Sequence, residues 1–87
     1  MGCTRAEFLR WLPGATRHAP MRLSADKALV QAPGATVEIS FTQASPRRIA
    51  LVSMPVLAVS FRFSGADALA YRDFMAYFDL YTKRGGG

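Results

Sequence analysis

The sequence predicts an α+β domain with a short N-terminal helix, an antiparallel meander of four to five strands, and a long C-terminal helix packed on the sheet. Residues 36–42 alternate between apolar and polar side chains, which is typical of a strand with one buried face. Residues 47–63 form a second, longer apolar stretch. Residues 66–84 contain neither proline nor glycine and place apolar side chains at helical spacing.

The N-terminal helix is predicted over residues 4–12. Thr4 and Glu7 have the spacing of a capping box, in which each side chain accepts a hydrogen bond from the backbone N–H of the other residue. Apolar side chains then recur on one face of the helix. Pro13 and Gly14 follow, and we expect this pair to end it.

Turn sequences divide the middle of the chain into short strands. Pro33 and Gly34 occupy the second and third positions of a predicted type II turn. Short connections of this kind favour antiparallel neighbours, so the sheet is predicted to be a meander. The expected strands are residues 21–23, 28–31 and 36–42, with turns at 24–27, 32–35 and 43–46.

The stretch from Arg47 to Phe63 is predicted to be one strand region. Pro55 cannot donate a ladder hydrogen bond, so it should mark a bulge, a bend or an edge. Residues 53–56 lack the glycine, asparagine or aspartate of a tight hairpin turn. Both faces of the stretch are apolar in the middle, which predicts a central strand covered on both sides. The second cover is expected from the N-terminal helix or from another subunit.

The C-terminal helix is predicted from Ala66 to Arg84, with Ser64 as its N-cap. Its apolar face should lie on the strand before it, because burying one large apolar side chain is worth roughly 1.5–3 kcal/mol. The predicted main core contact joins four rings: Phe74 and Phe78 of the helix, and Phe61 and Phe63 of the strand.

Length and composition indicate one domain over residues 1–84, followed by a flexible glycine tail at 85–87. Cys3 is the single cysteine, so no disulfide forms within the chain, and we expect a cytoplasmic location typical of a small bacterial domain. The longest uncharged apolar run, residues 49–61, is shorter than the roughly 20 residues of a membrane span. We therefore expect no membrane partner.

The sequence lacks the residue groupings that catalysis needs. Asp67, Asp73 and Asp79 lie at six-residue steps and do not share one helix face. His18 is the single histidine, which is insufficient for a metal site or a triad. We expect no catalytic residue, no metal site and no cofactor, and hence no enzymatic activity.

The net charge of +5 raises the alternative of nucleic-acid binding. The candidate contacts for an anion or a nucleic acid are Arg47, Arg48 and Arg62 at the rim of a sheet face. Single-strand readers also need exposed aromatic rings, whereas the phenylalanines of the predicted strands fall on the buried parity. Nucleic acid is therefore an alternative that we do not favour.

The chain ends in Lys83-Arg84-Gly85-Gly86-Gly87. This tail resembles the C-termini of ubiquitin-like sulfur carrier proteins. The resemblance covers only these last residues, and it implies a terminal carboxylate that is adenylated and thiolated, with Gly86 and Gly87 as the site. Carriers of that family reach the tail from a strand, whereas a helix is predicted here. The other interpretation is a helix end followed by glycines.

The function expected first is a small non-enzymatic protein-binding or accessory domain. Three tyrosines of the C-terminal helix, Tyr71, Tyr77 and Tyr81, spread more widely than one narrow stripe. Some of them should stay at the rim of the core, and tyrosine is favoured at interfaces. The expected partner is an unknown protein or a second copy of the chain.

Overall fold

The computed structural model describes residues 1–65 and 67–83 of the chain, and it confirms the predicted α+β class. Four antiparallel strands form one sheet in the order β1-β2-β3-β4, so the meander is also confirmed. The elements in chain order are α1 (Arg5–Ala15), β1 (Met21–Leu23), β2 (Lys27–Ala32), β3 (Ala35–Ile49), β4 (Val52–Ser64) and α2 (Ala68–Lys83).

Helix α1 begins with the predicted capping box. The Thr4 hydroxyl accepts a hydrogen bond from the backbone N–H of Glu7 at 3.1 Å, and the Glu7 carboxylate accepts one from the backbone N–H of Thr4 at 2.9 Å. The bond from the Thr4 backbone N–H to the carboxylate lowers the pKa of the Glu7 carboxyl, because it favours the charged form. Two of the orphan donors at the helix start are therefore satisfied within the sequence itself.

The predicted end of α1 at Leu12 is wrong, because the helix continues through Pro13 and Gly14 to Ala15. A Cβ atom added at Gly14 would overlap the hydroxyl and ring atoms of Tyr81 on α2. The glycine thus serves a close approach between two helices rather than a chain reversal.

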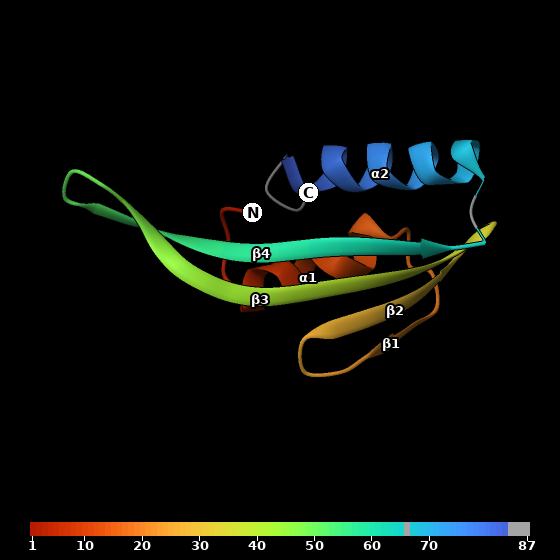
Figure 1. The fold of residues 1–87 in the computed structure, drawn as a ribbon, viewed down its shortest axis with the longest axis horizontal. Helices are drawn as coiled ribbons and strands as arrows, with labels where there is room; N and C mark the ends of the chain where they lie inside the picture. The colour runs from red at the N-terminus through yellow and green to blue at the C-terminus, as the bar shows by residue number, and fades with distance from the viewer. Residues whose placement is uncertain (66, 84–87) are drawn as a thin grey trace.

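Strands β3 and β4 form one long hairpin, so the prediction of a single strand from Arg47 to Phe63 is wrong. The chain reverses at Ala50 and Leu51, between the paired residues Ile49 and Val52. Residues 43–46, predicted as a turn, belong to β3. The hairpin runs well past the helices as a curved ribbon (Figure 1). The sequence hides this turn because its two residues are alanine and leucine.

The core lies between one face of the sheet and both helices. Phe78 of α2 is fully buried, with its ring centroid 5.0 Å from Phe61 and 6.1 Å from Phe8 of α1. The Phe8 ring lies 5.1 Å from that of Phe41 on β3. The predicted packing of Phe74 and Phe78 on the phenylalanines of β4 is confirmed.

Both helices cover the same face of the sheet, so of the two covers predicted for the second face, the N-terminal helix is wrong and another subunit stays a prediction. Strand β4 also lies at the edge of the sheet rather than in its centre. The side chains of Ala58, Ser60 and Arg62 on the second face are exposed. The physical reason is that Phe8 of α1 has its apolar partners, Phe41 and Phe78, on the first face.

The N-cap of helix α2 lies three residues after the predicted cap at Ser64, which instead ends β4. The Asp67 carboxylate accepts a hydrogen bond from the backbone N–H of Ala70 at 2.8 Å and so caps the helix. Gly65 has a positive φ of 70° where the chain leaves the strand.

Candidate functional site

The outer part of the β3–β4 hairpin, residues 45–56, is a projecting arm. Every residue from 45 to 54 is exposed. The tip lies about 20 Å beyond Leu57, a fully buried residue in the first half of β4, at roughly 3.3 Å per residue. Four large apolar side chains, which we call the apolar end of the arm, have these exposed fractions: Ile49 53%, Leu51 102%, Val52 59% and Met54 44%.

The root of the arm is a β-bulge. The register between β3 and β4 shifts between Ala44 and Arg47, where two residues of β3 oppose Pro55 alone. This confirms the prediction that Pro55 marks a bulge or an edge. The Gln43 side chain tethers the root, because its amide nitrogen donates to the Val56 carbonyl at 2.9 Å and its amide oxygen accepts from the Arg5 backbone N–H at 3.0 Å. The arm therefore leaves the domain from an anchored position.

The apolar end of the arm is concentrated on the face of the sheet opposite the helices. Val52 and Met54 lie an odd number of residues from Leu57, whose side chain is buried in the core, so they point to the other face. Their directly opposite partners, Ile49 and Arg47, share that face. One side of the arm thus presents three apolar side chains beside a guanidinium group.

The three arginines predicted as anion contacts are not brought together. Arg47 and Arg48 lie on the arm, opposite Met54 and Ser53, and both are exposed. Arg62 lies eight residues along β4 from Met54, which is about 26 Å of strand. Three charges at this spacing do not form one anion site.

Arg62 also has an acidic neighbour on the sheet. Its directly opposite partner on β3 is Glu38, and the Glu38 carboxylate lies 3.8 Å from the Lys27 ammonium. The second face of the sheet therefore carries mixed charge around Arg62. The predicted tail site, Gly86 and Gly87, lies outside the described residues.

The turn at the tip of the arm is strained. Ala50 has a φ of 54°, in the left-handed region where an alanine side chain costs roughly 1–2 kcal/mol. Two-residue hairpin turns normally place glycine, asparagine or aspartate at such a position. The tip thus keeps an apolar surface at the expense of stability.

We expect Ala50→Gly to stabilise the domain by about 0.5–1 kcal/mol. Glycine removes the left-handed strain, and the larger conformational entropy that glycine loses on folding offsets only part of this gain. Urea unfolding followed by circular dichroism measures this change. The matched control is Ala58→Gly on the exposed face of β4, which should destabilise by about 0.5–1 kcal/mol. A loss of stability in both variants would contradict the strained turn.

A second strained segment follows α1. His18 donates its backbone N–H to the Pro13 carbonyl at 2.8 Å, and Arg17 donates to the Gly14 carbonyl at 3.1 Å, which is the Schellman pattern. Arg17 and His18 have φ values of 55° and 58°. Arg17 therefore holds the left-handed position where glycine is usual.

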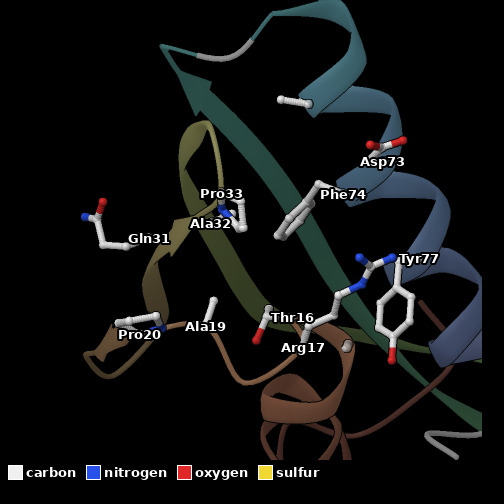
Figure 2. Close-up of a pocket in the computed structure, with 12 residues that line it drawn as sticks. Thr16, Arg17, Ala19, Pro20, Gln31, Ala32, Pro33, Asp73, Phe74 and Tyr77 are labelled. Atoms are coloured by element: carbon white, nitrogen blue, oxygen red, sulfur yellow. The ribbon is translucent and has the colours of Figure 1, made fainter.

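The Arg17 side chain extends from its loop to α2 (Figure 2), where the guanidinium lies over the ring of Tyr77, 4.2 Å from its centroid. A cation–π contact at an exposed site contributes about 0.5–1 kcal/mol. The left-handed strain of a non-glycine residue costs about 1–2 kcal/mol, so this contact at most offsets it. Fold stability alone does not account for an arginine at this position.

The described residues offer few other groups for nucleophilic catalysis or metal binding. Cys3 is buried, and burial raises the pKa of its thiol, which favours the protonated form. Within residues 1–65 and 67–83, no three histidine, cysteine, aspartate or glutamate side chains gather as metal ligands would. No helix in this part of the chain is long and apolar enough to cross a membrane.

Sequence reasoning found the two arginines of the arm but not the arm itself, and it missed Arg17. A tight turn without glycine, asparagine or aspartate gives no pattern to recognise. Arg17 gave no signal in the sequence, because its left-handed position follows from the continuation of α1 through Pro13 and Gly14, where the sequence predicted the helix to end. The chain matches no family model, no curated protein and no solved structure, so its own geometry is the basis for assigning a function.

Proposed function

We propose that this chain is a non-enzymatic protein-binding module that inserts the apolar end of its arm into an apolar groove of a partner protein. The observation that carries the proposal is the exposure of Ile49, Leu51, Val52 and Met54 at the end of a projecting hairpin. Single exposed apolar residues are ordinary on a protein surface, whereas a contiguous group is typical of an interaction site.

The free energy available at this surface is substantial. Burying one side chain of this size contributes roughly 1.5–3 kcal/mol, and four of them lie within six residues. The bulge and the Gln43 tether hold the root of the arm in place, which lowers the ordering cost of binding. The apolar end is therefore suited to be the centre of an interface.

Charge indicates which partner fits. Arg47 and Arg48 flank the apolar end, and residues 45–56 contain no acidic residue. Two copies of the chain that packed arm on arm would bring four guanidinium groups together. An apolar groove bordered by aspartate or glutamate complements the arm instead. We expect the module to work in the cytoplasm, because a domain with one cysteine and no disulfide suits a reducing compartment.

The test compares the wild-type chain with Leu51→Asp and with the matched control Leu69→Asp. Leu69 is 65% exposed and belongs to the first turn of α2. This helix begins at the opposite end of the molecule from the arm (Figure 1). Aspartate is favourable in the first turn of a helix, so the control should fold normally. A photo-crosslinking amino acid placed at position 51 or 69 then identifies what touches each site in cell extract.

The expected result is one protein that crosslinks at position 51 and not at position 69. The purified wild-type chain and the Leu69→Asp variant should bind this protein, and the Leu51→Asp variant should not. Arg47→Gln with Arg48→Gln should weaken that binding mainly at low salt. The proposal fails if no protein depends on Leu51. It also fails if sedimentation shows a dimer that Leu51→Asp converts to a monomer, because the occupant is then a second copy.

Nucleic-acid binding is the second candidate, and the free guanidinium groups of the arm favour it. Neither Arg47 nor Arg48 lies within ion-pair distance of an acidic side chain among the described residues. Two phosphate contacts predict an affinity that falls with salt at a logarithmic slope of about −2. Fluorescence polarisation with generic RNA and duplex DNA at low ionic strength tests it, and the absence of a salt-sensitive signal excludes it.

A further inference from the structure

A hollow of about 410 Å³ lies between the loop after α1, the turn joining β2 to β3, and helix α2 (Figure 2). Small-molecule sites usually enclose roughly 300–1,000 Å³. Much of the wall consists of small apolar side chains, and Phe74 extends into the hollow from α2 (Figure 2). The methyl groups that line it belong to Ala15, Ala19, Ala32 and Ala70.

Two side chains of opposite charge line the same hollow, Arg17 and Asp73. The Arg17 guanidinium lies over the Tyr77 ring, and such a group carries five N–H donors. Asp73 lies one helical turn before Tyr77 on α2. In the part of the chain that the structure describes, neither charge lies within ion-pair distance of an opposite one.

We propose that this hollow binds a free α-amino acid with an apolar side chain. The carboxylate of the ligand accepts hydrogen bonds from Arg17, the ammonium group is held by Asp73, and the side chain lies against Phe74 and the alanine methyl groups. A simple anion would be repelled by Asp73, and a simple cation by Arg17. A zwitterion satisfies both charges, which explains why an arginine is kept in a strained left-handed position.

The experiment uses the full chain with ¹³C-labelled alanine methyl groups, which places four reporters in the wall of the hollow. Free L-phenylalanine is titrated while the methyl spectrum is recorded. The probes that lack one charge are 3-phenylpropionate, without the ammonium group, and phenethylamine, without the carboxylate. We expect saturable shifts of the four alanine methyls with L-phenylalanine below about 10 mM, and at least tenfold weaker binding of the other two probes.

Arg17→Gly tests the site without endangering the fold, because glycine is the usual residue at that position of the Schellman motif. It should weaken L-phenylalanine binding at least tenfold. The matched control is His18→Gly, which relieves strain at the adjacent left-handed residue and does not line the hollow. Its binding should stay at the wild-type level.

Asp73→Asn removes the negative charge with almost no change of shape. It should bring the affinity for L-phenylalanine down towards that for 3-phenylpropionate. The proposal is overturned if L-phenylalanine produces no methyl shift up to about 10 mM. It is also overturned if 3-phenylpropionate binds as tightly, if Arg17→Gly binds like the wild type, or if Asp73→Asn binds L-phenylalanine more tightly.

Discussion

Replacing Phe78 by alanine should remove a large part of the stability of this domain. Phe78 is fully buried, and its ring lies within 6.1 Å of the rings of Phe8, Phe61 and Phe74. Truncating a buried phenylalanine costs about 3–5 kcal/mol, because both the transfer energy and the packing around the cavity are lost. A domain of 87 residues has a total free energy of unfolding of about 4–13 kcal/mol.

Thermal and urea unfolding of Phe78→Ala measure this loss. Two variants of the same helix calibrate it. Leu80→Ala alters a side chain that is 50% exposed and should change stability by less than about 0.5 kcal/mol. Phe78→Leu keeps part of the volume and should lie between the two. If Phe78→Ala and Leu80→Ala unfolded alike, Phe78 would not be the centre of the core.

The second large effect is expected at Gly14, where the sign of the result depends on another residue. An alanine in a helix interior is normally worth about 1 kcal/mol more than a glycine. At Gly14 the added methyl group would overlap the ring and hydroxyl of Tyr81. Overpacking of this kind costs about 1–3 kcal/mol, so Gly14→Ala should destabilise the wild-type chain by up to about 2 kcal/mol.

In a Tyr81→Ala background the obstacle is absent, and Gly14→Ala should become stabilising by up to about 1 kcal/mol. The double-mutant cycle therefore predicts a coupling energy of about 1–3 kcal/mol between the two positions, measured by urea unfolding of all four chains. Additive effects would show that α1 and α2 do not meet at Gly14.

The local features of the fold were largely predictable because their causes are local. The capping box depends on Thr4 and Glu7, three residues apart, and both of its hydrogen bonds are present. The turn between β2 and β3 depends on Pro33 and Gly34, and Gly34 has the φ of 77° that such a turn requires. In each case the residues that determine the local geometry are neighbours in the sequence.

The errors occurred where a distant contact outweighed a local preference. Gly14 lies within a helix because Tyr81 packs against it from α2. Ala50 adopts a left-handed conformation because the pairing of Ile49 with Val52 fixes the reversal there. The arm followed from this turn, so the exposed face that carries the proposed function was also out of reach of the sequence.

The candidate sites divide in the same way. The sequence indicated Arg47 and Arg48 from charge alone, but it grouped them with Arg62. Arg47 is paired with Met54, and Arg62 lies about 26 Å from Met54 along β4. Arg17 and Asp73 are 56 positions apart in the chain, and only the packing of α2 beside the loop after α1 brings them to one hollow. No spacing rule connects residues that far apart.

By itself, the sequence determined the class of the fold, the capping of α1, and the phenylalanine contacts between α2 and β4, since hydrophobic periodicity and adjacent polar groups fix these over a few residues. Only the tertiary structure decided the edge position of β4, the single covered face of the sheet, the turn at Ala50 and the hollow beside Arg17. These features depend on which surfaces meet, and an apolar stretch with two usable faces does not specify which face another element will cover.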